Sequence, residues 1–209
     1  MITEKMEQGS PEWFAARCGN VTGSRVADVV SKGRGSAPSA SRKNYMAQLV
    51  AERLTGNVAE TFTSPAMLHG IETEAEAANA YAFLKDAELS EIGFAWHDTI
   101  KQAGASPDRL VGADGLVEIK CPNTATHLDT LRGGSIKGGY IIQMQWQMAC
   151  TGRAWCDFVS YDPRLPESMR LHCTRVERDQ KHIDELEAAV SAFLAELETT
   201  CADLVAKYG

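Results

Sequence analysis

The sequence lacks any uninterrupted run of 18 or more apolar residues, so it holds no candidate membrane-spanning helix. Its first residues, MITEKMEQ, lack the apolar stretch of a signal peptide, and we expect a soluble, cytoplasmic protein. The six cysteines form no CxxC pair and the five histidines show no HxH or HxxxH spacing, which disfavours zinc ribbons and four-cysteine iron–sulfur clusters. Excess positive charge is also missing, because 28 acidic against 21 basic residues give a net charge of −7. This balance argues against a protein that holds nucleic acid by bulk charge alone.

Composition and patterning predict one folded α/β domain. Hydrophobic residues make up 44% of the chain and charged residues 23%, which is typical of a globular protein. The length of 209 residues matches a single domain over residues 1–209, with its core at about 7–200. Helical and strand-like segments alternate, which favours a central mixed β-sheet flanked by helices.

Capping residues and apolar spacing locate the expected elements. Ser10 followed by Pro11 is typical of a helix start, and apolar steps of three to four residues over about 179–207 predict a closing amphipathic helix. Segment 32–41 is basic and rich in Gly, Ser and Pro, which predicts a mobile loop. The other expected helices lie near 42–54, 64–85 and 141–151, and the expected strands near 92–96, 116–120, 155–161 and 169–176.

The main chemical signal is Ser106-Pro107-Asp108, followed after nine residues by Glu118-Ile119-Lys120. In a strand, Glu118 and Lys120 project from the same face, which taken alone describes a common surface ion pair. Asp108 supplies a second carboxylate just before a turn that folds back on this strand. Two carboxylates and a backbone carbonyl are the hard oxygen ligands that Mg²⁺ prefers, and a neighbouring lysine can orient an attacking water.

The length of the turn between the two acids decides whether such a site can form. A two-residue Asp114-Gly115 hairpin would place Asp108 and Glu118 on opposite faces of the sheet. A three-residue loop, Ala113 to Gly115, with the glycine in the left-handed region, would place both on one face. The metal-site hypothesis therefore predicts an odd-length loop or an equivalent bulge.

Two predicted helices add polar side chains to this picture. Glu74 shares a helical stripe with Ile71 and Tyr81, so a carboxylate lies on an otherwise apolar face. Such a group is costly unless it is bound to metal or forms a salt bridge to a core-facing arginine, and both alternatives are open. Gln143 and Gln147 share one face of the helix near 141–151, where neutral amides can hydrogen-bond a phosphate or a metal-bound water, although chance placement also explains them.

These features resemble the PD-(D/E)xK nuclease superfamily, in which a Glu-bearing helix precedes the motif and a Gln-bearing helix follows it. Other segments between about 7 and 200 are similar to the phage lambda exonuclease family of YqaJ-like viral recombinases. They are Glu7-Gln8-Gly9, Trp13, Arg17, Gly19, Thr22-Gly23-Ser24, Gly70 with Glu74, Glu118-Ile119-Lys120-Cys121-Pro122, Gln143 with Gln145, Tyr161-Asp162-Pro163-Arg164 and Glu177-Arg178-Asp179. The resemblance implies a restriction-endonuclease-like α/β core.

The resemblance also implies an activity. Members of this family are alkaline exonucleases that use Mg²⁺, and here we expect one or two ions with Mn²⁺ as a substitute. They digest one strand of linear double-stranded DNA from its 5′ end to mononucleotides. The remaining 3′ overhang serves homologous recombination through a single-strand annealing protein. A ring-shaped homotrimer around the DNA and a phage or prophage origin, in the cytoplasm of a bacterial host, are implied in the same way.

Site roles follow from the resemblance position by position. The residues implied to hold metal are Asp108, Glu118, the backbone carbonyl of Ile119 and, at or near a second ion, Glu74. Lys120 is implied to position the nucleophilic water, with Gln143 assisting. Arg17, Ser24 and Ser106 match positions that grip the terminal 5′ phosphate, a task suited to a guanidinium fork and hydroxyl donors.

Three further positions carry weaker implications. Arg34, in the basic loop, matches a residue that contacts the duplex ahead of the site, and Asp98 matches an additional acidic position. Arg109 departs from the family, which often has glycine there, so an altered turn or an added phosphate contact is expected.

Two other classes stay open at this point. A different PD-(D/E)xK enzyme, such as a structure-specific or restriction-type endonuclease, shares the metal centre but needs no grip on a 5′ phosphate. A catalytically inactive DNA-binding module is disfavoured by the intact Asp108, Glu118 and Lys120. The net negative charge no longer excludes DNA, because metal ions would neutralise the acidic cluster.

Overall fold

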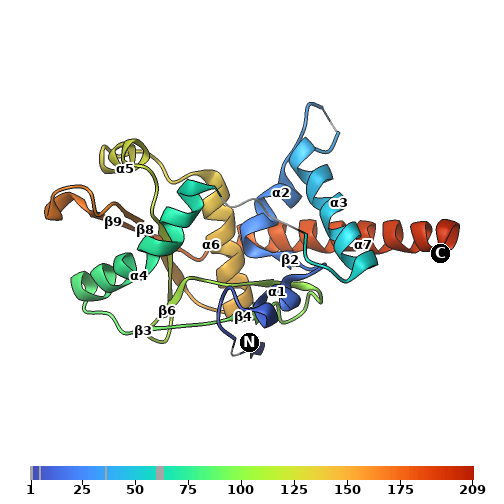
Figure 1. The fold of residues 1–209 in the computed structure, drawn as a ribbon, viewed down its shortest axis with the longest axis horizontal. Coiled ribbons are helices and arrows are strands. Elements are labelled where there is room, and N and C mark those ends of the chain that lie inside the picture. The colour runs from blue at the N-terminus through green and yellow to red at the C-terminus, as the bar shows by residue number, and fades with distance from the viewer. Residues whose placement is uncertain (1, 5, 36, 60–63) are drawn as a thin grey trace.

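The computed structural model describes residues 2–4, 6–35, 37–59 and 64–209 (Figure 1). It confirms the helices that capping and periodicity predicted and adds shorter ones. The helices are α1 (Pro11–Arg17), α2 (Val26–Val30), α3 (Ala40–Thr55), α4 (Pro65–Lys85), α5 (Thr124–Leu131), α6 (Gly138–Thr151) and α7 (Gln180–Tyr208), with 3-10 turns η1 (Gly23–Arg25) and η2 (Glu167–Met169).

The described strands form two mixed sheets rather than one. They are β1 (Ile2–Glu4), β2 (Val21–Thr22), β3 (Leu89–Ser90), β4 (Phe94–Trp96), β5 (Ala103–Ala105), β6 (Arg109–Val111), β7 (Gly115–Lys120), β8 (Trp155–Tyr161) and β9 (Leu171–Glu177). The smaller sheet has the order β1-β4-β5-β2 and the larger β3-β6-β7-β8-β9. Pairs β2/β5 and β7/β8 are parallel and the other pairs antiparallel. The predicted α/β class, with helices packed on mixed β-structure, is therefore confirmed, whereas the single central sheet is corrected to two sheets.

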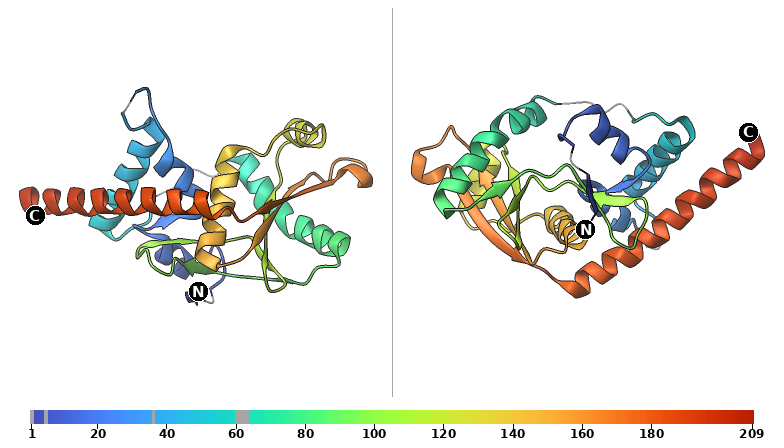
Figure 2. Two further views of the ribbon diagram at one scale, coloured as in Figure 1. Left: turned by 180° about the vertical axis from the view of Figure 1, so that it is seen from behind. Right: turned by 90° about the horizontal axis from the view of Figure 1, so that it is seen from below.

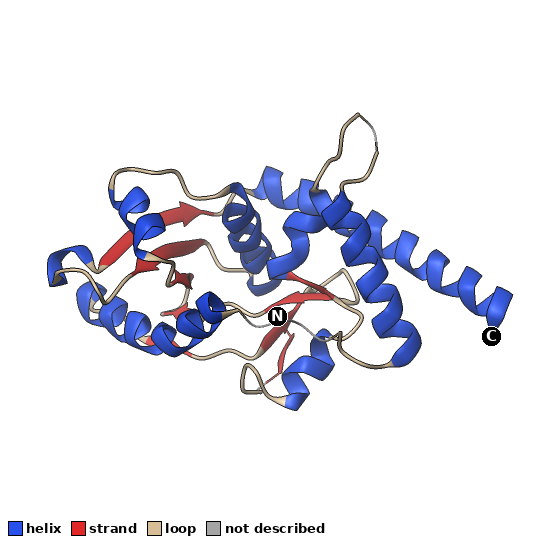
Figure 3. Ribbon diagram, turned by 45° about the horizontal axis from the view of Figure 1, so that its top comes forward, coloured by secondary structure: helices blue, strands red, loops and turns tan. Residues whose placement is uncertain are grey.

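Helix α6 lies between the two sheets, and α4 covers the opposite face of the larger one (Figure 3). The alternation along β7 explains this layering, because successive side chains point to opposite faces. Val117 and Ile119 pack with Tyr81 of α4 in one buried cluster, whereas Leu116 packs with Met144 of α6 in another. Since Glu118 and Lys120 share the face of Leu116, both point toward α6.

The C-terminal helix was predicted at about 179–207 and is observed at Gln180–Tyr208. The Asp179 side chain caps it by accepting the backbone N–H of His182 at 3.1 Å. Its apolar face is buried as far as Leu197 and packs with α2, α3 and α6, while the remaining turns project from the body (Figure 2). Although α7 has 29 residues, neither it nor any other helix in the described part of the chain is long and apolar enough to cross a membrane.

The turn between β6 and β7 has the expected odd length but lies one residue earlier than predicted. Arg109 pairs with Val117 and Val111 with Gly115, which leaves residues 112–114 as a three-residue loop. The positive φ of 48° belongs to Gly112 and not to Gly115. Gly115 lies in the strand for another reason, since a Cβ atom there would lie 2.1 Å from the indole ring of Trp155.

Candidate active site

Strand β7 carries a fully buried carboxylate, Glu118, held by amides from α6. The Nε2 atoms of Gln143 and Gln147 donate to Oε1 and Oε2 of Glu118, each at 2.6 Å. The Lys120 ammonium donates to Oε1 as well. A buried carboxylate needs hydrogen-bond partners to offset its loss of water, and here the two glutamines and the lysine supply them to both oxygens of Glu118.

Asp108 comes directly before β6 and lies beside Glu118. Extending the strand register by one residue places Asp108 opposite Glu118 on the same face, as the metal-site hypothesis requires. Oδ2 of Asp108 accepts the backbone N–H of Ile119 at 2.6 Å. Because the amide and carbonyl of one strand residue point to the same side, the Ile119 carbonyl also faces Asp108. Gln8 fixes this segment from outside by donating to the Pro107 carbonyl at 2.8 Å.

The crowding of acids shifts the proton affinities at this point. Burial raises the pKa of Asp108 well above its ordinary value, and the nearby carboxylates of Glu118 and Glu74 raise it further, against the opposing effect of Lys120. Burial disfavours the charged form of Lys120, but the carboxylates of Glu118 and Asp108 outweigh it and raise the pKa of this ammonium. A carboxylate that resists ionisation next to other acids is a group that a cation would stabilise.

The donors present fit Mg²⁺. No group of three or more His, Cys, Asp or Glu side chains among the described residues is arranged to hold a metal by itself. Asp108 and Glu118 instead supply two carboxylates with a backbone carbonyl beside them, and Mg²⁺ in proteins is usually bound by one or two carboxylates plus water and substrate phosphate. An all-protein cage is therefore not expected at this site.

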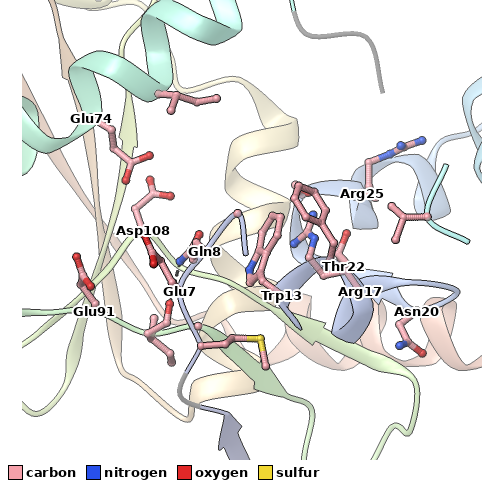
Figure 4. A pocket seen from close by; sticks show the side chains of 18 of the residues that line it. Glu7, Gln8, Trp13, Arg17, Asn20, Thr22, Arg25, Glu74, Glu91 and Asp108 are labelled. Carbon is pink, nitrogen blue, oxygen red and sulfur yellow. Dashed lines mark hydrogen bonds between the residues drawn. The ribbon is translucent and has the colours of Figure 1, made fainter. Parts of the chain in front are cut away.

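Glu74 lies at the rim of the same site but is paired with an arginine. Its Oε1 accepts from Nη1 of Arg109 at 3.1 Å, the ion pair that was the alternative to metal binding. The helical stripe predicted for Glu74 is confirmed at Ala78 and Tyr81, which are buried, and is wrong at Ile71, which is 69% exposed. Figure 4 shows the carboxylates of Glu74 and Asp108 together at one end of a cleft of about 1210 Å³.

The other end of this cleft holds Trp13 and Arg17 of α1 (Figure 4). The Arg17 guanidinium stacks on the Trp13 ring, with its carbon 4.0 Å from the ring centroid. The Trp13 indole N–H donates to the Ser106 hydroxyl at 2.8 Å, so Arg17, Trp13 and Ser106 form one chain of contacts that ends two residues before Asp108. Burial lowers the pKa of Arg17 to about 10, which leaves it cationic at neutral pH.

The remaining predicted residues lie at different distances from this cleft. Ser24, in η1, lines the same cleft as Arg17. Arg34 lies on the exposed loop between α2 and α3, outside the residues that line the cleft. Asp98 follows β4 and lies near Cys150 of α6, where burial, Glu187 and Asp98 together raise the thiol pKa. Asp98 itself is exposed and is not among the residues that line the cleft.

Three supporting residues were not assigned roles from the sequence. Trp13 connects Arg17 to Ser106, Gln147 holds Glu118 beside Gln143, and Glu52 is a buried carboxylate. Glu52 accepts the backbone N–H of Gly19 at 2.7 Å and so fixes the turn that follows Arg17. Gln147 had a sequence signal because it shares a helical face with Gln143, and Trp13 had one because it is among the residues that carry the family resemblance. Glu52 had none.

Comparisons with known proteins agree with this arrangement. The model of the YqaJ-like viral recombinase domain matches residues 12–154. The alkaline exonuclease LHK-Exo from Laribacter hongkongensis, solved alone and with dAMP, is 54% identical with a TM-score of 0.89 over 95% of this chain and 97% of that chain. A phage-related exonuclease from Haemophilus somnus shares the fold, with a TM-score of 0.72 at 17% identity over 88% and 96% of the two chains. ExoD of Escherichia coli K12 is 28% identical over 75 residues, which are 36% of this chain and 85% of that protein.

The fold, together with its match to an alkaline exonuclease at 54% identity, defines a nuclease of the hydrolase class in which Asp108 and Glu118 lie opposite each other at the open end of the β6–β7 hairpin. Within that class, the chain belongs to the family of YqaJ-like viral recombinase domains. The resemblance drawn from the sequence motifs is thereby confirmed.

Proposed function

We propose that this protein is a Mg²⁺-dependent exonuclease that digests one strand of linear double-stranded DNA from its 5′ end. It releases mononucleotides and leaves a 3′ overhang for homologous recombination by strand annealing. The observation that carries the proposal is the contact chain from Arg17 through Trp13 to Ser106, which leads straight to Asp108. An anion-binding guanidinium and the acid pair thus share one cleft, as removal of a 5′-terminal nucleotide requires.

Each residue has a physical task in this reaction. Arg17 binds the terminal phosphate through its planar fork, with Ser24 and Ser106 as hydroxyl neighbours. Asp108, Glu118 and the Ile119 carbonyl hold the metal, which when bound supplies charge stabilisation to the phosphate under attack. Lys120 orients the attacking water, and Gln143 and Gln147 keep Glu118 in place.

The relatives support the finer points of this proposal. LHK-Exo is an alkaline exonuclease, and its complex with dAMP is consistent with a mononucleotide product. As further parts of the proposal, Mn²⁺ replaces Mg²⁺, the protein forms a homotrimeric ring around DNA, and a single-strand annealing protein receives the overhang. Its place of action is the cytoplasm of a bacterial host that carries the phage or prophage.

Digestion of a linear duplex labelled at either end tests the direction and the cofactor. With Mg²⁺, label at the 5′ end of a strand appears at once as a mononucleotide, whereas label at its 3′ end stays on long fragments. A chelator stops digestion of both labelled duplexes. Covalently closed plasmid is spared; cutting of that plasmid would support the endonuclease alternative instead.

The variant Lys120→Ala separates the enzyme from an inactive DNA-binding module. Loss of the ammonium that orients water is expected to slow digestion by at least about 100-fold, which is typical of removing a proton-handling group. Binding of the duplex should persist, because phosphate contacts in the cleft remain. An unchanged rate would show that the hydrolytic centre is assigned to the wrong residues.

A further inference from the structure

A second, smaller cavity of about 270 Å³ lies beside Lys120. Its walls come from the end of β7, from β8, from α5, from the segment that joins α5 to α6 and from the first turn of α6. It shares none of its lining residues with the larger cleft that contains Arg17 and Asp108. Lys120 therefore lies between the acid pair and a cavity to which the mechanism above gives no role.

The charge in this cavity is mainly positive. The ammonium groups of Lys120 and Lys137 lie 5.3 and 6.0 Å from the centroid of the same Tyr140 ring, so two cations lie beside one aromatic ring. Asp129 is the single carboxylate among the described residues that line the cavity, and it is exposed. Lys120 is drawn toward Glu118, which leaves Lys137 as the more adaptable of the two cations.

Two other parts of the wall offer no donor to an anion. Tyr140 stacks on Phe158 with centroids 5.8 Å apart and forms a rigid apolar side. Ser160 also lines the cavity, but its hydroxyl lies 2.7 Å from Nδ1 of buried His127. Nε2 of His127 bonds the Met169 carbonyl, which only accepts, so in the neutral imidazole Nδ1 accepts the Ser160 proton. Ser160 then has no proton to donate to an anion.

We propose that this cavity binds the second internucleotide phosphate of the strand being digested, with Lys137 as the residue that recognises it. The inference rests on the proposed function. With the terminal phosphate at Arg17 and the scissile phosphate at Asp108, Glu118 and Lys120, the next phosphate lies one nucleotide beyond Lys120. The cationic cavity that Lys120 itself lines is the site available to it. After each cleavage the strand advances by one nucleotide, and the phosphate held at Lys137 becomes the scissile one.

A lysine that holds a non-bridging phosphate oxygen acts as a point charge and reads no base. Its loss should therefore weaken binding to all sequences alike and lower the slope of log K against log salt by about 1. In digestion it should raise KM with little change in kcat, because Lys137 does not touch the reacting atoms.

The test measures binding of a fluorescent 5′-phosphorylated duplex in Ca²⁺, an oxygen-seeking cation used here in place of the catalytic metal. A neutral methylphosphonate replaces the second linkage in one duplex and the sixth linkage in a control duplex. For the unaltered protein, the change at the second linkage should weaken binding about tenfold, the value of one charge-assisted contact, and the change at the sixth should have less effect.

In Lys137→Ala, binding to unmodified DNA should weaken about tenfold, with no more than about twofold further loss on the second-linkage duplex. The proposal would be overturned if Lys137→Ala and the second-linkage methylphosphonate together weakened binding about 100-fold. It would also be overturned if that methylphosphonate did not weaken binding by the unaltered protein. Lys137→Arg should retain most of the affinity, and Lys181→Ala, an exposed lysine outside both cavities, should match the unaltered protein. Failure of the proposed function appears separately, as absence of Mg²⁺-dependent digestion of unmodified duplex.

Discussion

Asp108 destabilises the metal-free fold at neutral pH, because its folded-state pKa is raised above the unfolded value by burial and by Glu118. A carboxyl group whose pKa is raised by folding lowers the free energy of unfolding at every pH above its unfolded pKa. Asp108→Asn should therefore raise the Tm of the metal-free protein by a few degrees. Mg²⁺ should stabilise the unaltered protein by about 1.4 kcal/mol at ten times its dissociation constant and leave the variant unchanged. Thermal melts with Mg²⁺ and with chelator measure both effects. Equal Mg²⁺ stabilisation of the two proteins would place the metal elsewhere, and Asp203→Asn is the control.

Arg17 is the residue whose loss should change which DNA end is preferred. Arg17→Ala removes the guanidinium stacked on Trp13 and should reduce the preference for 5′-phosphorylated over 5′-hydroxyl ends at least tenfold, toward unity. Arg17→Lys should restore only part of it, since an ammonium lacks the planar fork. Competition digests of the two ends measure the ratio, and the rate on 5′-hydroxyl DNA serves as the internal control. An unchanged preference in Arg17→Ala would refute the phosphate grip.

At the level of single residues, sequence spacing identified Asp108, Glu118 and Lys120, and it placed Gln143 and Gln147 on one helix face without showing that both bond Glu118. The period of two along a strand is enough to put Glu118 and Lys120 on one face. The role of Trp13 depends on its hydrogen bond to Ser106, which lies 93 residues away in the sequence. No local sequence pattern predicts a contact between residues so far apart. Likewise, whether Glu74 bonds metal or arginine depended on where Arg109 points.

The β6–β7 hairpin is the element that sets the register of the two acids, and Arg153 holds it closed. Nη1 of Arg153 donates to the carbonyls of Val111, Gly112 and Gly115 at 3.2, 3.0 and 2.7 Å. Arg153→Ala leaves these carbonyls without their partner and should lower the unfolding free energy by about 1–3 kcal/mol. Its kcat should also fall at temperatures where the variant is fully folded, because a loosened hairpin misplaces Asp108 against Glu118.

Urea unfolding and single-turnover digestion of Arg153→Ala measure these two effects. Arg132→Ala, which alters an exposed residue just after α5, is the matched control and should change neither. If Arg153→Ala is as stable and active as the unaltered protein, the loop residues alone fix the register of β6 and β7.

Long elements were predictable and short ones were not. The apolar spacing of α7 and the cap at Ser10 report directly on local backbone geometry. Strands β2, β3, β5 and β6 have two or three residues each, too few for a period to appear. Their pairing comes from tertiary contacts, and so the division into two sheets on either side of α6 was not visible in the sequence.

Over the whole molecule, the acidic balance has a structural explanation. Glu52, Glu118, Asp157 and Asp162 are all buried, so part of the acidic excess lies in the interior, where each carboxylate joins elements distant in sequence. Arg175 and Tyr81 bind Asp157 and so connect β8 to β9 and α4. The charge count alone therefore overstates how negative the surface facing DNA is.

These buried carboxylates make the fold sensitive to acid. Burial opposes ionisation of Asp162, but hydrogen bonds from Arg164 and Thr124 outweigh it and lower its pKa to about 2, and the pKa of Asp157 is lowered in the same direction by Arg175 and Tyr81. With unfolded values near about 3.9, their stabilisation is present above about pH 4 and is lost as the pH falls toward about 2. Urea unfolding between pH 7 and 2 should show this decline. Asp162→Asn should be less stable at pH 7, lose less stability between pH 4 and 2, and approach the unaltered protein at the acid end. Parallel curves for the two proteins would mean that folding does not shift the pKa of Asp162.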